Sequence, residues 1–541
     1  MTGPSEPAAD IVQPSPSRGG AALVATGILF SRIFGLVRNR LIGHFLGAGM
    51  PAEAFFAAIR IPNFLQNMFG EGVLSASFIP VYARLIAEGN DEEAGLVAGA
   101  VGTLLALTSA VIVLLGIVAA PYAIPLIAPG FIGEKRELTI LLVQIMFPGV
   151  GLLVLSAWSL GVLNSHRKFF LSYASPVAMN VVMIATLLWF GPRFAVDSAA
   201  QVRLVAVLAW ASVVGSAVQL FVQLPTVIRV ERRLRAEFAV SNTQVRTLLK
   251  NFVPVFIGRG VVQISAYADG WLASFAIAGA VPVLGYAQVI SILPVSLFGM
   301  SVSAAALPAM SGELGNDETV SAALRSRLHD GLHRIAFYVV PSSMAFLALG
   351  DIVVGVLYQS GQFTHDLTVW TWTVIAGSAV GLLASTLGRL YSSAWYAMRD
   401  TRTPLKYAMI RVVLTIGLGY VAALKLPGWL GINPRWSVAG LTASAGVAAW
   451  VEFVLLRRSI ARRIGPVGVD GRYVGTLWLA AGIAALPALG IKWMMGVGHP
   501  LVLGLVALPV YGAAYFALCA RFKLPEAAAV FGRLGRLVGR R

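Results

Sequence analysis

The sequence contains very little cysteine and lacks the short motifs on which most enzymes depend. Cys519 is the only cysteine among 541 residues, so the chain can form neither an internal disulfide nor a cysteine-based metal site. It also has no Ser-His-Asp motif of the hydrolase type and no phosphate-binding glycine loop. We therefore expect a protein that is not an enzyme and that needs no cofactor and no metal ion.

Charged residues are also scarce, at 12% of the chain, whereas 57% of the residues are hydrophobic and the mean hydropathy is +0.79. This composition is typical of an integral membrane protein. The formal net charge of +17 would suggest nucleic acid in a soluble protein, but here the basic residues cluster in short gaps between apolar runs. We therefore expect membrane lipids, and no nucleic acid, among the partners.

Fourteen apolar stretches approach or exceed the roughly 20 residues that a helix needs to cross a bilayer. They lie near residues 21–46, 52–80, 95–127, 138–164, 170–191, 202–228, 247–276, 282–309, 332–358, 367–396, 404–424, 436–456, 473–494 and 499–520. The predicted fold is an all-α polytopic membrane protein with about fourteen transmembrane helices.

The distribution of basic residues predicts the orientation. We assign 28 of the 41 lysines and arginines to the two tails and to connections after even-numbered spans, and only 7 to connections after odd-numbered spans. Because basic residues concentrate on the cytoplasmic side, both termini are predicted to be cytoplasmic, which requires an even number of spans.

A weak internal repeat divides the chain into two lobes. Segment 77–84 resembles segment 305–312, about 228 positions later, and Arg32 falls opposite Arg259. Six spans separate the copies, so both run in the same direction, as in transporters built from parallel repeats. The predicted organisation is a disordered cytoplasmic tail at 1–20, a six-helix N-lobe at 21–228, a cytoplasmic linker at 229–246, a six-helix C-lobe at 247–456, two further helices at 473–520 and a basic cytoplasmic tail at 521–541.

Six arginines fall inside the predicted spans, namely Arg32, Arg38, Arg40, Arg60, Arg259 and Arg389. Each costs roughly 2.5 to 3.5 kcal/mol at the centre of a helix that faces lipid. Three or four of them would cost on the order of 10 kcal/mol, comparable to the net stability of a whole protein. We therefore expect them to face water, a ligand or a counter-ion.

The second span carries a polar stripe. Glu53, Arg60, Asn67 and Glu71 are spaced so that they fall within about 40° of one another on a helix, and Asn63 adds a further polar group. One interpretation is that these residues pair internally and hold the bundle together. The alternative, which we favour, is a wet cationic cavity, because the arginines outnumber the glutamates and a guanidinium fork suits phosphate.

Asp269, in the seventh predicted span, leaves two alternatives open. It is a candidate for coupling transport to a proton or another cation, because ionisable groups inside the membrane mark such pathways. Otherwise it pairs with Arg259 or with an arginine of the cavity.

Several ordered motifs resemble the MurJ/MviN family of lipid II flippases. They are Ser31-Arg-Ile-Phe-Gly-Leu-Val-Arg38, Gly47-Ala-Gly-Met-Pro-Ala-Glu-Ala-Phe-Phe56, Arg60-Ile-Pro-Asn63, Phe69-Gly-Glu-Gly72, Ala128-Pro-Gly-Phe131, Leu357-Tyr-Gln-Ser-Gly-Gln-Phe-Thr364 and Arg399-Asp-Thr-Arg-Thr-Pro-Leu-Lys406. The resemblance extends over nearly the whole chain.

The resemblance implies the fold of the multidrug/oligosaccharidyl-lipid/polysaccharide exporter superfamily, with a central cationic cavity and a groove for the lipid tail at 473–520. It implies alternating access that moves lipid II, the undecaprenyl-pyrophosphoryl disaccharide-pentapeptide, to the outer leaflet of the bacterial cytoplasmic membrane. Partners among the cell-wall synthesis proteins are a further expectation. By position, the functional cavity residues of the family fall on Arg32, Arg38, Glu53, Arg60, Glu71 and Arg389.

Some positions depart from the family pattern. Members commonly carry Asp at the position of Asn39, an arginine at Gln66, and an Asp-Arg pair at Gln288 and Val289. Arg259 is a candidate to compensate for the loss at Val289. These departures leave two alternatives open, an exporter of another polyprenyl-linked glycan or small molecule, and a non-transporting scaffold for cell-wall enzymes.

Overall fold

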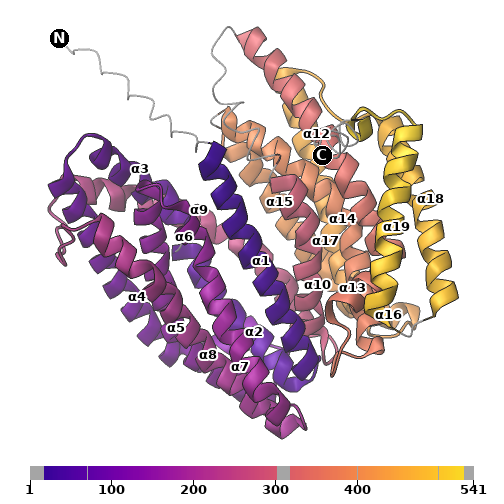
Figure 1. The fold of residues 1–541 in the computed structure, drawn as a ribbon, viewed down its shortest axis with the longest axis horizontal. Coiled ribbons are helices and arrows are strands. Elements are labelled where there is room, and N and C mark those ends of the chain that lie inside the picture. The colour runs from indigo at the N-terminus through magenta and orange to yellow at the C-terminus, as the bar shows by residue number, and fades with distance from the viewer. Residues whose placement is uncertain are drawn as a thin grey trace, which may run out of the picture. The chain divides into compact units, whose positions relative to one another are not determined.

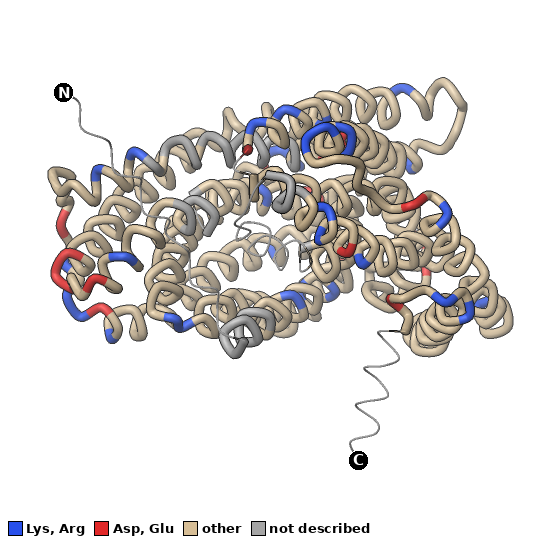
Figure 2. The backbone as a smooth tube through the Cα atoms, turned by 90° about the horizontal axis from the view of Figure 1, so that it is seen from above, with Lys and Arg blue, Asp and Glu red and all other residues tan. Residues whose placement is uncertain are grey.

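The computed structural model describes the backbone of residues 18–69, 71–300, 302, 317–398, 400–496 and 499–528. The side chains that it describes do not include those of Glu71 and Arg259. The expected tails lie largely outside these ranges. Figure 1 shows the helices, and Figure 2 shows long runs of helix without a charged residue.

The described residues form helices and contain no β-strand, which confirms the all-α prediction. The helices in the first half are α1 (Arg18–Leu46), α2 (Met50–Phe69), α3 (Glu71–Ala87), α4 (Asp91–Ile127), α5 (Gly133–Ser165), α6 (Phe169–Ala174), α7 (Pro176–Phe194), α8 (Ser198–Val230) and α9 (Thr243–Ser274). Those in the second half are α10 (Ala280–Pro294), η1 (Val295–Met300), α12 (Asp317–Ala348), α13 (Gly350–Tyr358), α14 (His365–Ala397), α15 (Arg402–Tyr420), η2 (Val421–Lys425), α16 (Leu426–Leu430), α17 (Trp436–Ile464), α18 (Gly471–Met495) and α19 (Pro500–Arg521).

The predicted count of fourteen spans is only partly supported. Among the described residues, 10 helices are long and apolar enough to cross a membrane, or 11 if the bent pair of α12 and α13 forms one span. The three predicted spans outside this set correspond to α1, to α2 with α3, and to α9. These are the helices that carry most of the predicted intramembrane charges, which lower their hydropathy.

One predicted span is not a continuous helix. Residues 332–358 were expected to form one helix, but α12 ends at Ala348 and α13 follows at an angle of 84°. In the predicted span at 52–80, the structure describes α2 up to Phe69 and α3 from Glu71. The described part of the predicted stripe comprises Glu53, Arg60 and Asn67 of α2.

The chain forms two compact units. Unit 1 comprises residues 1–41, 57–126 and 133–264, and unit 2 comprises residues 42–56, 127–132 and 265–541. Residues 42–56, which form the elbow between α1 and α2, thus belong to unit 2, although most of α1 and most of α2 belong to unit 1. The predicted lobes at 21–228 and 247–456 remain a prediction.

Unit 1 is centred on α5 and α8, which pack along each other, with α7 against α8. Buried amides connect them, since Gln219 and Gln223 of α8 both donate from Nε2 to Ser156 Oγ of α5 at 3.0 Å. Gly149 lets the helices approach, because a Cβ there would lie 3.3 Å from Ser216 Oγ. Such interhelical hydrogen bonds and small residues are what holds helices together where lipid surrounds them.

Unit 2 is centred on α14, which packs against α17, α12 and α10. Its glycines Gly377 and Gly381 lie against the backbone of α17, where a Cβ would come within 2.5 Å of Ala439 O and 2.3 Å of Gly446 Cα. The last helices, α18 and α19, lie side by side at the yellow end of the chain in Figure 1. Tyr515 of α19 donates to Phe337 O of α12 at 2.7 Å, which fixes this pair to the unit.

The connection after α8 is bound tightly to unit 1. The hydroxyl of buried Tyr82 donates to Glu231 Oε2 at 2.8 Å and lies 3.0 Å from His166 Nε2. Because a hydroxyl has one proton, and Tyr82 gives it to Glu231, the imidazole of His166 must be the donor to Tyr82. Just beyond Glu231, the linker crosses α4 at Gly95 and Gly99.

We expect Gly99→Ala to destabilise unit 1, because a Cβ there would lie 2.1 Å from Arg235 O of the linker. Overpacking of this kind costs about 1 to 3 kcal/mol. The thermal midpoint of the purified protein in detergent should fall by several degrees. Gly475→Ala in α18 is the matched control, since no described atom lies within 4 Å of the added Cβ; its midpoint should stay the same or rise. Equal midpoints for both variants would contradict the packing account.

Candidate functional site

Helix α1 presents three arginines in unit 1, and they differ in their surroundings. Arg32 is exposed on the protein surface, whereas Arg38 and Arg40 are half-buried. A Cβ on Gly35 would meet no described atom within 4 Å, so there is open space beside the helix one turn from Arg32. A glycine in such a place lets a bulky group approach the backbone.

Arg38 is held in place by neighbours on two helices. Its Nη2 donates to Asn39 Oδ1 at 3.4 Å, and its Nη1 lies 4.0 Å from Met183 Sδ on α7. Asn39 and Met183 are both buried, at 7% and 0% exposure. These two contacts help to orient the guanidinium of Arg38.

Helix α2 carries the polar stripe that the sequence predicted, over part of its length. Arg60, Asn63 and Asn67 lie in one continuous helix at spacings of three and four residues, and therefore share a face. Arg60 is half-buried, and both asparagines are exposed. All three belong to unit 1, together with the arginines of α1.

Glu53 lies on the same helix but belongs to unit 2, and it is almost completely buried at 3% exposure. Its Oε1 accepts a hydrogen bond from the backbone N–H of Gly279 at 2.9 Å. Gly279 precedes α10 with a φ of +89°, a conformation that favours glycine. This bond anchors the elbow between α1 and α2 in unit 2.

Further contacts hold the same elbow. Tyr286 of α10 donates from its hydroxyl to Gly47 O at 2.8 Å, and the backbone N–H of Gln362 donates to His44 O at 2.8 Å. The rings of Phe56 and Tyr286 meet edge to face at 4.9 Å. Sequence reasoning did not reveal these contacts, and the assignment of Glu53 to substrate binding stays a prediction.

The remaining predicted residues lie on α9 and α14. Arg389 is exposed on α14 in unit 2, and Asp269 is half-buried on α9 in the same unit. The backbone of Arg259 lies on α9 in unit 1. An ion pair that the sequence analysis missed joins Arg411 of α15 to Glu452 of α17 at 3.0 Å.

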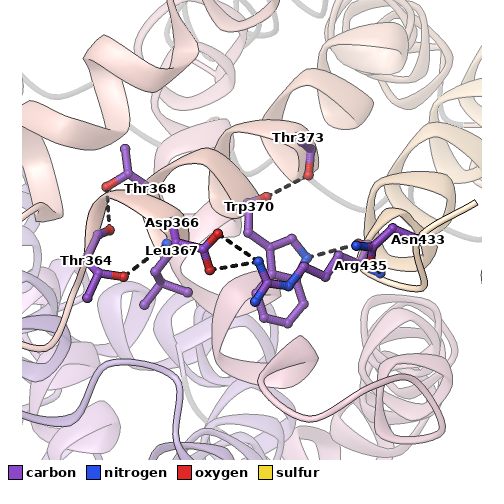
Figure 3. A network of polar contacts seen from close by, with 8 residues as sticks. All are labelled: Thr364, Asp366, Leu367, Thr368, Trp370, Thr373, Asn433 and Arg435. Carbon is purple, nitrogen blue, oxygen red and sulfur yellow. Dashed lines mark hydrogen bonds and ion pairs between the residues drawn. The ribbon is translucent and has the colours of Figure 1, made fainter. Parts of the chain in front are cut away.

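A second missed cluster joins the beginnings of α14 and α17 (Figure 3). Arg435 Nη1 bonds both carboxylate oxygens of Asp366, at 2.8 and 2.7 Å, and its guanidinium lies 5.5 Å from the centre of the Trp370 ring. Trp370 Nε1 donates to Arg435 O at 2.9 Å. No pattern within one segment could have found it, because 69 positions separate the charges.

The chemistry available is that of anion binding. Within the described part of the chain, no three His, Cys, Asp or Glu residues come together in a way that could hold a metal ion. Unit 1 instead offers arginines on two helices, with exposed amides beside them. Arginines arranged in this way can bind a phosphate group.

The model of a family described as "Lipid II flippase MurJ" matches residues 42–511 of this chain. A probable lipid II flippase MurJ from Haemophilus influenzae is 30% identical over 452 residues, which cover 80% of this chain and 84% of that protein. A lipid II flippase MurJ from Burkholderia cenocepacia is 29% identical over 516 residues, which cover 92% and 96%.

Solved structures show the same fold. A lipid II flippase MurJ in an inward closed conformation superposes with a TM-score of 0.76 at 23% identity, covering 93% of this chain and 98% of that one. An inward-facing multidrug resistance transporter of the MATE family, from the MOP superfamily, gives 0.61 at 18% identity, covering 82% and 98%.

We expect Glu53→Ala to lower the thermal midpoint of the detergent-solubilised protein, because it removes a charged acceptor from the buried N–H of Gly279. Hydrogen bonds to charged groups contribute about 1.5 to 3 kcal/mol. Glu53→Gln retains an acceptor oxygen and should lose less than half as much. If both variants lose the same amount, the bond to Gly279 is not what anchors the elbow.

Proposed function

The chain belongs to the lipid II flippase MurJ family, and from this premise we propose that arginines of α1 and α2 bind the pyrophosphate of its substrate. The protein is a lipid II flippase, a transporter and not an enzyme, and a multi-pass protein of the bacterial inner membrane. Its transport supplies the precursor for peptidoglycan synthesis. Neither alternative, an exporter of another glycan nor a scaffold, gains support from the comparisons.

One observation supports the proposed site: Arg32, Arg38 and Arg60 belong to the same compact unit, in which Arg38 contacts Asn39 and Met183. A pyrophosphate offers several oxygens with negative charge, and planar guanidinium groups bind such oxygens in pairs. The open space beside Gly35 leaves room for a headgroup. Asn63 and Asn67 are suited to the sugar and peptide, since exposed amides both donate and accept hydrogen bonds.

The proposal also assigns roles to four further charged residues and to the last two helices. Arg259 and Arg389 are candidates to receive the headgroup as the transporter changes conformation, and Glu71 to compete with it for an arginine. Asp269 is the candidate for cation or proton coupling. Helices α18 and α19 offer exposed Leu479 at 57% and Leu505 at 74% exposure, which suit a lipid tail.

Orientation and partners follow from the distribution of charge. With both termini in the cytoplasm, the ends of α14 and α17 reach the cytoplasmic face, and the cluster of Arg435 and Asp366 faces outward. Cell-wall synthesis proteins are candidate partners on either face.

Single replacements of Arg32, Arg38 and Arg60 by alanine should each reduce transport at least tenfold, roughly the loss of one charged hydrogen bond. The assay is rescue of flippase-depleted cells, combined with direct measurement of lipid II in the outer leaflet. Arg38→Lys should retain part of the activity, because it keeps the charge and loses the fork.

Arg193→Ala is the matched control, since this arginine lies over the ring of Trp189 at the end of α7 and has no part in the proposed site. It should transport normally. Full rescue by the three site variants, at normal levels in the membrane, would place the pyrophosphate elsewhere.

The membrane potential should contribute to export. A negative charge that moves outward gains about 2.3 kcal/mol per 100 mV when the inside is negative. Collapsing the potential in cells should therefore slow the appearance of lipid II in the outer leaflet. Unchanged translocation would exclude this energy source and favour coupling through Asp269.

A further inference from the structure

A cavity of about 350 Å³ lies at one end of unit 2, and none of the residues proposed to bind lipid II lines it. Its lining residues are Trp395, Met398, Asp400 and Arg463. They come from the end of α14, from the connection to α15 and from the end of α17.

The packing of α14 and α17 explains why this cavity exists. Contacts between them advance together along both chains, from Gly377 with Thr442, through Gly381 with Gly446, to Gly388 with Leu456. The two helices are therefore parallel, and their carboxyl ends lie at the same end of the unit. The cavity opens where both end, at Ala397 and Ile464.

Trp395 supplies a hydrogen-bond donor that no part of the described chain satisfies. The side chain is only 7% exposed, and its Nε1–H is buried without an acceptor among the described residues. Leaving such a donor unpaired costs about 1 to 3 kcal/mol. An acceptor in the cavity would recover this cost.

The acceptors nearby are already engaged. Asp400 Oδ1 accepts from the backbone N–H groups of Arg402 and Thr403, at 2.9 and 3.0 Å, and Oδ2 accepts from Thr403 Oγ1 at 2.7 Å. These bonds, chiefly the backbone bond from Thr403, hold the pKa of the Asp400 carboxyl below its usual range. The carbonyls of Ala394 and Trp395 accept from Met398 and Asp400.

Among the described lining groups, those left to meet a ligand are therefore donors. They are the exposed guanidinium of Arg463 and the indole of Trp395, whose enclosed Nε1–H an anion reaches once the ring turns toward the cavity. The surroundings are positive, because Arg402 and Lys406 begin α15, and Arg458 and Arg462 lie in the last turns of α17. Both donors and charge favour an anion.

We propose that this cavity binds the phosphate of an anionic phospholipid, with Arg463 and Trp395 as its donors. The ends of transmembrane helices lie at the depth of the headgroups. Basic clusters beside transmembrane helices attract anionic lipids, and the positive-inside rule assigns this cluster to the cytoplasmic leaflet. A bound phosphate would connect the ends of α14 and α17.

Native mass spectrometry of the full-length protein in detergent, titrated with phosphatidylglycerol, tests this proposal. Arg463→Gln should weaken binding about tenfold and Trp395→Phe about threefold, because each removes a donor and Phe retains most of the ring. Arg462→Gln is the matched control, one residue away and outside the cavity lining, and should bind as the wild type does. Phosphatidylcholine should bind more weakly than phosphatidylglycerol and equally to all four proteins.

Two outcomes would overturn the proposal. Loss of phosphatidylglycerol binding in Arg462→Gln equal to that in Arg463→Gln would indicate general surface charge. Displacement of the lipid from the wild type by equimolar inorganic phosphate would identify a soluble phosphate as the occupant. Lipid II transport is not part of the readout, so failure here leaves the proposed function untouched.

Discussion

The cost of placing charge inside a bilayer is the constraint on which the first two helices depend. An arginine facing lipid at the centre of a helix costs several kcal/mol, so each one needs water, a partner or a ligand. In unit 1, the guanidinium of Arg38 contacts the side-chain amide of Asn39 and the thioether of Met183.

The elbow between α1 and α2 is subject to a second constraint, which is that a buried backbone N–H needs a hydrogen-bond acceptor. Both helices belong mainly to unit 1, but their junction at residues 42–56 belongs to unit 2. Glu53 holds it there through the N–H of Gly279, a backbone group that otherwise would be buried without a partner. Helix α1 therefore passes from unit 1 to unit 2 after Leu41, and α2 passes back after Phe56.

Composition and periodicity were enough to predict where the helices lie. Contacts between residues that are far apart in the chain could not be predicted in this way. Apolar stretches predicted the helical fold, and spacing predicted the shared face of Arg60 and Asn67. The division of 332–358 at Leu349 was missed because hydropathy runs through the 84° bend. The bond from Gly279 to Glu53 could not be predicted, because Gly279 lies 226 positions away and offers only a backbone group. Nor could the approach of the linker backbone at Arg233 and Arg235 to Gly95 and Gly99 be predicted from α4 alone.

The departure at Asn39 now has a physical interpretation. Relatives that carry Asp at this position would place a negative charge beside Arg38, and the pair would be close to neutral. Asn39 keeps the acceptor oxygen, which bonds Arg38 Nη2 at 3.4 Å, and removes the charge. The exchange removes one negative charge beside Arg38 at a buried position, where electrostatic interactions are less screened than in water. The net charge of each predicted lobe is nevertheless unchanged by these departures, because Gln66 stands where an arginine is expected, and Gln288 and Val289 together replace one acid and one base. What the departures change is therefore the position of positive charge along the chain and not its amount.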